Sequence, residues 1–397
     1  MKTHLRLLPL LTIALATCAA AQTIGAPAPA AMPQLPVPPP PALGADSYVL
    51  MDYQTGDLIA HKNMHERLAP ASLTKLMTAY VVDAALASGK VHWDDPVYIS
   101  EHAWKKGGAV TDGSTSFLKL HQRYPLSKVY NGMIVQSGND AAIALAEHVA
   151  GSEGAFVQLM NDYAQRLGMT GTHFENASGY PHPDHYTTAY DLGLLARAII
   201  ADFPQYYGIY KIPSYTISGI KQGNRNLLLY HDPSVDGLKT GSTAEAGFCL
   251  VASALRHGQR MIGVVMKTKN LSDAASEDEA LLNYGFSFFS THTLYASGRP
   301  LATPRLWEGA ANRLPVGVAQ AVEVTLPRGH FHDLKTAMNL PATLIAPFRK
   351  GETVGTLTVS LDGKQLMTAP LVALADAPQA GLFGRLYDEV FMWFHEH

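Results

Sequence analysis

The spacing of hydrophobic positions changes several times along the chain, and each change predicts a new structural element. Apolar and β-branched residues at 47–51 and 58–60 flank a polar, glycine-containing turn, which predicts a β-hairpin. Behind Pro70 the apolar positions recur every three or four residues until Gly89, as a helix requires. Further predicted helices are 141–149, 153–167, 189–201 and 281–289, and predicted strands are 248–254 and 261–266.

Strand-like runs therefore lie on both sides of a large helical insert, which predicts an α/β body with helices packed on a sheet. From about Leu301 the pattern becomes all-β, and a hairpin turn at Asp362-Gly363 joins its last two runs. We predict a body at residues 45–297 and a separate small β domain at 298–377. The strand-like runs of the β domain are 322–326, 343–346, 353–361 and 365–374.

The last segment, 378–397, is predicted to contain an amphipathic helix from Gly381 to His397. Its apolar residues fall largely on one side and three charged residues on the other. The helix is too short and too charged to span a bilayer, so it would lie in the membrane interface. Docking on its own protein is the alternative. The apolar set is Leu382, Phe383, Leu386, Val390, Phe391, Trp393 and Phe394, and the charged set is Arg385, Asp388 and Glu389.

The N-terminus has the pattern of a secretory signal peptide. A short basic region precedes the apolar run 7–16, and Ala19-Ala20-Ala21 supplies the small residues that signal peptidase requires. We predict a signal peptide at 1–21 and a semi-extended Pro/Ala-rich tether at 22–44. The alternatives are a membrane-spanning anchor, for which the apolar run is too short, and lipidation at Cys18.

The formal net charge is −3, and removal of residues 1–21 would make it −5, because Lys2 and Arg6 leave with no acidic residue. This balance gives no reason to expect nucleic acid as a partner. The mature chain would keep one cysteine, Cys249, so it cannot form an internal disulfide. Cys249 stands in an apolar run and is interpreted as a core residue.

A candidate nucleophile lies at the start of the helix that follows Pro70. In Ser72-Leu73-Thr74-Lys75 the serine and lysine share one helix face, so the amine can reach the hydroxyl. Lysine acts as the base only if burial or a neighbouring cation lowers its pKa. The same spacing at Ser116 and at Ser218 begins no apolar helix and is interpreted as chance.

Two further motifs follow in the chain, Ser137-Gly138-Asn139 before a helix and Lys239-Thr240-Gly241 before an apolar strand. The order of the three motifs resembles the signature of penicillin-binding proteins and serine β-lactamases. The surrounding sequences and the order of domains are similar to those of the low-molecular-mass D-alanyl-D-alanine carboxypeptidases. The resemblance implies an antiparallel sheet with helices on both sides, followed by a small β domain.

The resemblance also implies roles for the motif residues. Ser72 would attack the carbonyl between the two terminal D-alanines, and Lys75 would act as base. Ser137 would relay a proton to the departing amine, and Asn139 would hold Lys75 and a substrate amide.

Lys239 would keep Lys75 neutral and attract the substrate carboxylate, to which Thr240 would offer a hydroxyl. Gly241 would let the edge strand approach the substrate. The backbone N–H groups of Ser72 and Ser242 would form the oxyanion hole. The group that activates the deacylating water is not identified.

The sequence departs from the family pattern at one point. Relatives often carry an arginine beyond the last catalytic strand that helps to bind the terminal carboxylate. The matching stretch here, 267–276, has Lys267 and Lys269 and no arginine. Lysine lacks the bidentate guanidinium, so substrate binding is expected to be looser or differently oriented.

No cofactor or metal is predicted. His182, Asp184 and His185 lie in a proline-interrupted loop and are interpreted as a surface loop rather than a zinc site. The acidic run 277–279 is interpreted as a solvated helix start.

We expect a carboxypeptidase that trims peptidoglycan stem peptides, is acylated by β-lactams and works in the periplasm. One alternative is a β-lactamase. Efficient class A β-lactamases use a glutamate, with an asparagine shortly after it, to activate the deacylating water. Glu175 and Asn176 are adjacent here and so lack that spacing. A second is an endopeptidase of the same fold, whose relatives commonly lack the β domain. A third is an inactive scaffold, which the intact motifs do not support.

Overall fold

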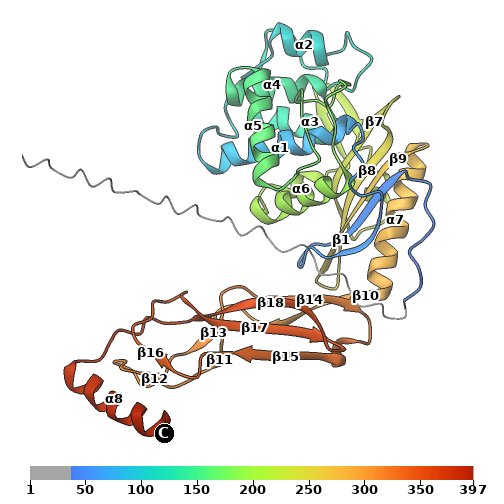
Figure 1. The fold of residues 1–397 in the computed structure, drawn as a ribbon. Coiled ribbons are helices and arrows are strands. Elements are labelled where there is room, and N and C mark those ends of the chain that lie inside the picture. The colour runs from blue at the N-terminus through green and yellow to red at the C-terminus, as the bar shows by residue number, and fades with distance from the viewer. Residues whose placement is uncertain (1–36, 397) are drawn as a thin grey trace, which may run out of the picture.

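The computed structural model describes residues 37–396, and Figure 1 shows their arrangement. The predicted signal peptide (1–21) and the first part of the predicted tether (22–36) lie outside the described residues. The remainder of the tether packs against the body. Val37 and Leu43 contact its hydrophobic core, and the Tyr284 hydroxyl donates a 2.8 Å hydrogen bond to the carbonyl of Pro38. The end of the proline-rich segment is therefore bound along the body.

A five-stranded antiparallel sheet forms the centre of the body, in the order β2-β1-β9-β8-β7. The predicted hairpin and the two predicted strands are confirmed as β1, β2, β8 and β9. The N-terminal hairpin joins the sheet through the pairing of β1 with β9, and β7 is left at the edge. The strands are β1 (Ser47–Asp52), β2 (Leu58–Lys62), β7 (Val235–Thr243), β8 (Gly247–Arg256) and β9 (Gln259–Thr268).

Side chains of the sheet alternate between two hydrophobic cores. In β1, Val49 and Met51 face the larger helical layer, whereas Leu50 faces α7 (Leu271–Phe288). Because strand side chains point alternately to opposite faces, a strand buried along its whole length needs cover on both sides. α6 (Ala189–Asp202) lies on one face and α7 on the other, as Figure 1 shows. The expected fold class, an antiparallel sheet with helices on both sides, is confirmed.

The helical insert between β2 and β7 contains the first two sequence motifs, which begin at Ser72 and Ser137. The predicted helices are confirmed as α1, α4, α5 and α6, with glycines in the left-handed region at Gly89, Gly151 and Gly168 just behind three of them. The elements are η1 (Ala71–Leu73), α1 (Thr74–Ala87), β3 (Pro96–Tyr98), α2 (Glu101–Gly107), β4 (Arg123–Pro125), α3 (Leu126–Val135), α4 (Asn139–Ala150), α5 (Glu153–Arg166), η2 (Tyr207–Lys211), β5 (Ser214–Ile217), β6 (Ile220–Gly223) and η3 (Leu227–Tyr230).

The closing helix begins earlier than predicted, because the Asn270 side chain caps it by accepting a hydrogen bond from the Asp273 amide. The interpretation of 277–279 as a solvated helix start is wrong for Asp278, which is completely buried against Gly263 of β9. Burial raises the pKa of Asp278 well above its usual range, so this carboxyl group is held protonated.

The C-terminal part of the chain forms a β domain with its own hydrophobic core. A five-stranded sheet runs in the order β11-β13-β18-β17-β15, and β10 pairs with β14. The predicted turn at Asp362-Gly363 joins β17 to β18, with both residues at positive φ. The elements are β10 (Phe289–Tyr295), β11 (Pro300–Ala302), β12 (Leu306–Trp307), β13 (Val316–Val318), β14 (Val322–Pro327), η4 (Phe331–Asp333), β15 (Leu334–Asn339), β16 (Leu344–Ile345), β17 (Thr353–Leu361) and β18 (Lys364–Ala373).

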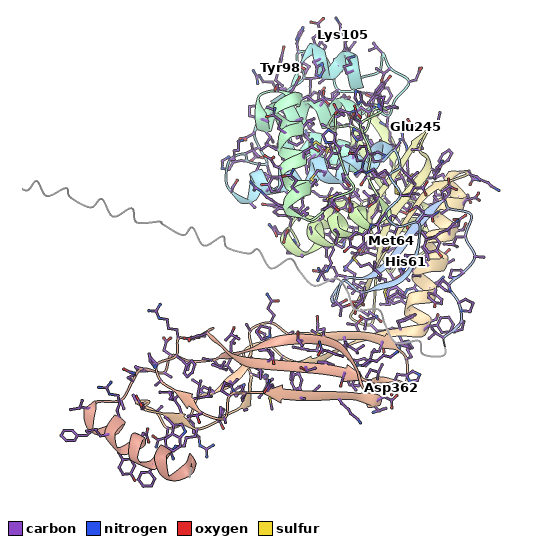
Figure 2. All side chains as sticks on the ribbon, in the orientation of Figure 1. His61, Met64, Tyr98, Lys105, Glu245 and Asp362 are labelled. Atoms are coloured by element: carbon purple, nitrogen blue, oxygen red, sulfur yellow. The ribbon has the colours of Figure 1, made fainter. Side chains whose placement is uncertain are left out.

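The predicted C-terminal helix is present as α8 (Leu382–Glu396), and it docks on the β domain through a polar contact. The Asp388 carboxylate accepts hydrogen bonds from Arg305 Nη2 at 3.0 Å and from the Glu308 amide at 2.8 Å. α8 lies at the opposite end of the β domain from Asp362, which Figure 2 labels. In the part of the chain that is described, no helix has the length and apolar content needed to cross a bilayer.

The apolar residues of α8 with described side chains are exposed. Phe383 is 87% exposed and Leu386 is 52% exposed. The helix therefore faces its own protein with Asp388 and turns apolar groups outward. Among the residues named above for this helix, the side chains of Glu389, Val390, Trp393 and Phe394 lie outside the described set.

We predict that Gly263→Ala destabilises the protein by about 1–3 kcal/mol, because overpacking a dense core costs that much. A Cβ at this position would lie 1.8 Å from Asp278 Oδ1. Thermal unfolding followed by circular dichroism measures the effect. Gly154→Ala is the matched control, since nothing lies within 4 Å of its Cβ position, and it should be neutral or slightly stabilising. Equal stability of the two variants would contradict the packing argument.

Candidate active site

Ser72 and Lys75 lie at the junction of η1 and α1, on one face, as their spacing predicts. Lys75 is completely buried, and its Nζ donates hydrogen bonds to Ser72 Oγ at 2.9 Å and to Asn139 Oδ1 at 2.7 Å. A third hydrogen bond, of 2.6 Å, goes to the backbone carbonyl of Ser178. The amine therefore contacts neutral oxygen atoms, one of which belongs to the candidate nucleophile.

Ser137 and Asn139 follow α3, in the sharp connection to α4. Ser137 is a non-glycine residue at φ +61°, a conformation that costs energy and is held by its surroundings. Its hydroxyl is buried and has no hydrogen-bond partner among the described residues, so it touches neither Ser72 nor Lys75 through a hydrogen bond. Ser137 does line the same cavity as Ser72. Asn139 is thus hydrogen-bonded to Lys75, whereas the Ser137 hydroxyl is free to form a hydrogen bond with a ligand in the cavity.

Asp140 stabilises this connection, and the sequence patterns did not single it out. Its carboxylate accepts hydrogen bonds from the backbone amides of Ser116 at 2.8 Å and Leu118 at 2.9 Å, and from the Thr115 hydroxyl at 3.0 Å. These bonds tie the loop before β4 to the start of α4. An acidic residue at the first turn of a helix is a common sequence feature, so only the tertiary contacts reveal its role.

The third motif lies on the edge strand β7, directly beside the nucleophile turn. A Cβ on Gly241 would lie 2.9 Å from the carbonyl oxygen of Pro70 and 3.1 Å from the amide nitrogen of Ser72. Glycine is therefore required for β7 to pack on η1, in addition to the expected approach of substrate. Thr240 is buried, and Ser242 is exposed.

Lys239 brings a second buried amine to the site. Its Nζ donates a 3.0 Å hydrogen bond to the Thr240 carbonyl. Burial, with a further contribution from Arg225, lowers the pKa of Lys239 to about 7. Burial also lowers the pKa of Lys75 well below its usual range, and the cations at Lys239 and Arg225 lower it further. The structure therefore supports a neutral Lys75 that can accept a proton from Ser72.

A loop between α5 and α6 also contacts the site, through the Ser178 carbonyl that accepts a hydrogen bond from Lys75. Asn176 Oδ1 accepts hydrogen bonds from the amides of Gly179 at 2.7 Å and Tyr180 at 2.9 Å, which shapes the turn that presents the Ser178 carbonyl. Gly179 lies at φ +86°, and a Cβ there would lie 1.8 Å from the carbonyl oxygen of Ala71. The sequence signal that could have located this turn is the Ser178-Gly179 pair.

The three residues considered as metal ligands, His182, Asp184 and His185, do not all lie on the surface. His185 is buried; its Nε2 lies 2.8 Å from Thr74 Oγ1, and burial lowers its pKa to about 4. His182 and Asp184 stay on the surface, where their ligand atoms and one of Glu175 lie within 4.8 Å of one another. Glu175 is exposed and bonds His173 at 3.0 Å, so it does not face Ser72.

A cavity of about 180 Å³ opens beside the nucleophile. Its lining has hydroxyl groups from four separate parts of the chain, together with two apolar side chains and one guanidinium. The lining residues are Ser72, Ser114, Ser137, Arg225, Thr240, Gly241, Ser242, Phe248 and Leu271. In Figure 2 the labels of Lys105 and Glu245 lie at the end of the body that is far from the β domain.

Comparison with known proteins gives consistent matches over both parts of the chain. The family model described as D-alanyl-D-alanine carboxypeptidase matches residues 34–270, and that described as penicillin-binding protein 5, C-terminal domain, matches residues 289–379. The D-alanyl-D-alanine carboxypeptidase DacC of Escherichia coli is 42% identical over 359 residues, with 90% of each chain covered.

Two solved structures extend the likeness. Penicillin-binding protein 5 of Haemophilus influenzae superposes with a TM-score of 0.81 at 38% identity, covering 86% of this chain and 99% of that one. The ampicillin-bound form of penicillin-binding protein D2 of Listeria monocytogenes gives a TM-score of 0.55 at 29% identity. That match covers 63% of this chain and all of that one, 100%.

The Lys239 cation lowers the pKa of Lys75, so Lys239→Gln should raise that pKa and move the acid limb of acylation to higher pH. The sign follows because acylation requires neutral Lys75, and a higher pKa keeps the amine protonated to a higher pH. The measurement is the rate of labelling by a fluorescent penicillin as a function of pH. Lys239→Arg retains the charge and should keep the wild-type midpoint. A midpoint that falls, or stays unchanged, in Lys239→Gln would contradict the electrostatic coupling.

Proposed function

The chain belongs to the D-alanyl-D-alanine carboxypeptidase family, and we propose that it removes the terminal D-alanine from peptidoglycan stem pentapeptides through an acyl-enzyme on Ser72. The observation that carries this proposal is the 2.9 Å contact between Ser72 Oγ and the buried Nζ of Lys75. A serine hydroxyl becomes a useful nucleophile when a neighbouring base accepts its proton.

Acylation proceeds in balanced steps. Neutral Lys75 accepts the Ser72 proton while Ser72 Oγ bonds to the carbonyl carbon between the two D-alanines. The backbone N–H groups of Ser72 and Ser242 stabilise the oxyanion, and one such donor is typically worth about 3–4 kcal/mol. The C–N bond then breaks, and the proton from Lys75 reaches the departing amine through Ser137. The unpartnered Ser137 hydroxyl in the cavity wall supports this relay.

Substrate binding uses the groups around this centre. Asn139 holds Lys75 at 2.7 Å and has its amide nitrogen available for a substrate carbonyl. Thr240 offers a hydroxyl to the terminal carboxylate, and Lys239 supplies positive charge behind it. Gly241 allows β7 to lie close to both the nucleophile turn and the substrate. Water then attacks the ester carbonyl and releases the shortened peptide with Ser72 restored.

β-lactams acylate the same serine, because they present a strained amide and a carboxylate in place of the D-alanyl-D-alanine end. The ampicillin-bound structure of the Listeria relative supports this part of the proposal. A β-lactamase is disfavoured because Glu175, the one acidic residue weighed for deacylation, is exposed and turned to His173. The β domain, matched by its own family model, argues against an endopeptidase that lacks one.

We further propose that the enzyme is exported by residues 1–21 and works in the periplasm, with α8 lying on the outer face of the inner membrane. The polar contact of Asp388 with Arg305 faces α8 toward its own domain, and Phe383 and Leu386 point away from it. A helix that docks by its polar side and exposes its apolar side suits an interface. We also propose that the peptidase domain spans residues 45–297 and the β domain spans residues 298–377.

Ser72→Ala should lower D-alanine release from a synthetic peptide ending in D-Ala-D-Ala by at least about a thousandfold, as loss of a catalytic serine does elsewhere. It should also abolish labelling by fluorescent penicillin. Ser218→Ala is the control, since Ser218 and Lys221 repeat the spacing of the motif outside the site. Release that survives Ser72→Ala would overturn the mechanism.

Replacing Phe383 and Leu386 together by Ser should weaken binding to phospholipid vesicles by roughly 100-fold, because each large apolar side chain contributes more than 1 kcal/mol on burial. Cosedimentation with vesicles containing anionic phospholipid measures it. Met338→Ser removes another exposed apolar residue of the β domain, on β15, and should leave binding unchanged. Equal binding by wild type and the α8 variant would refute the membrane role.

A further inference from the structure

Arg225 is the only charged residue among those that line the cavity beside Ser72. The two lysines of the motifs are buried behind the wall, Lys75 completely and Lys239 nearly so. A carboxylate that enters the cavity therefore meets one guanidinium directly. The remaining polar wall consists of hydroxyl groups, which can donate hydrogen bonds but carry no charge.

Two buried asparagines hold Arg225 in place between β6 and η3. Asn224 Nδ2 donates a 3.1 Å hydrogen bond to the carbonyl of Ile212, and Asn226 Nδ2 donates one of 3.1 Å to the carbonyl of Gly237 on β7. The second bond connects the loop to the strand that carries Thr240. The position of Arg225 relative to the third motif is therefore set by backbone contacts rather than by a flexible chain segment.

The guanidinium of Arg225 has no acidic partner in the described part of the chain. Its Nη1 donates a short hydrogen bond to Ser114 Oγ, and no ion pair involves it. Arg256 and Arg260, by contrast, pair with Asp232 at 2.8 Å and Asp236 at 2.7 Å. A guanidinium offers five donors in a fork that matches a carboxylate, so an arginine without an acid beside a substrate cavity is suited to an anionic group.

The two lysines that stand where relatives carry an arginine do not fill this role. Lys267 forms an ion pair of 3.2 Å with Asp46, and neither Lys267 nor Lys269 lines the cavity. Leu271, close behind them in the chain, contributes an apolar side chain to the wall instead. Lys239 supplies only part of a charge at neutral pH, because burial lowers its pKa to about 7.

We propose that Arg225 binds the terminal carboxylate of the substrate together with Thr240, and so replaces the arginine that relatives place beyond the last catalytic strand. This inference rests on the proposed carboxypeptidase function. It makes Arg225 a determinant of specificity for peptides with a free C-terminus. Ser114, which accepts the Nη1 hydrogen bond, orients the guanidinium across the cavity.

The test compares two peptides ending in D-Ala-D-Ala, one with a free carboxylate and one with a C-terminal amide. Arg225→Gln should lower kcat/KM for the free acid by roughly 10- to 100-fold, the range for a hydrogen bond to a charged group. The loss should appear mainly in KM. The amide should lose much less, because it presents no charge and is affected only through the influence of Arg225 on the pKa of Lys75. Arg225→Lys should recover part of the loss.

Lys269→Gln is the matched control, because it removes a positive charge near Leu271 and should leave both substrates unaffected. Thermal unfolding verifies that each variant is folded. An equal loss on the two peptides would overturn the proposal, since it would show that Arg225 acts through the buried lysines. A selective loss in Lys269→Gln, or no loss in Arg225→Gln, would overturn it as well.

The proposed function is tested separately by Ser72→Ala. Release of D-alanine that depends on Ser72 but not on Arg225 would leave the carboxypeptidase intact and remove only the assignment of Arg225. Acylation by a penicillin and by its carboxylate ester gives a second, independent comparison. Arg225→Gln should slow acylation by the free acid more than acylation by the ester, and an equal effect on the two would contradict the proposal.

Discussion

Lys75 lies in the interior with no solvent exposure, and its amine is bonded only to neutral oxygens of Ser72, Asn139 and Ser178. An ammonium group in such a place would be costly, because burial disfavours the charged form and no carboxylate contacts it. The cheaper state is the neutral amine, which is also the state that can accept a proton. In the proposed mechanism, burial of this one group is what makes the Ser72 hydroxyl a nucleophile.

Enclosing that amine requires backbones to approach more closely than side chains allow. Gly241 lets the edge strand β7 pack on the nucleophile turn, and Gly179 lets the opposite loop pack on Ala71. The sheet supplies the rigid part of this arrangement, since β7 is held by β8 and the sheet is covered on both faces. The result is a cavity that has the two buried lysines behind its wall and Arg225 in its lining.

At one end of the β domain, α8 exposes apolar side chains on the surface of the molecule. The β domain has its own core, and α8 contacts this domain through Asp388, while the described apolar side chains Phe383 and Leu386 are exposed. The exposed Phe383 and Leu386 are thus oriented away from the protein.

The sequence by itself determined the local features: the order of helices and strands, the Ser72–Lys75 pair and the hairpin at Asp362. These depend on residues three or four apart, or on a turn, where spacing dictates geometry. The order of the motifs indicated the family. The burial of Asp278, the carbonyl of Ser178 and the place of Arg225 in the cavity were decided only by tertiary structure. They arise from contacts between segments that are distant in the chain. The spacing of hydrophobic residues does not predict which of these distant segments come into contact.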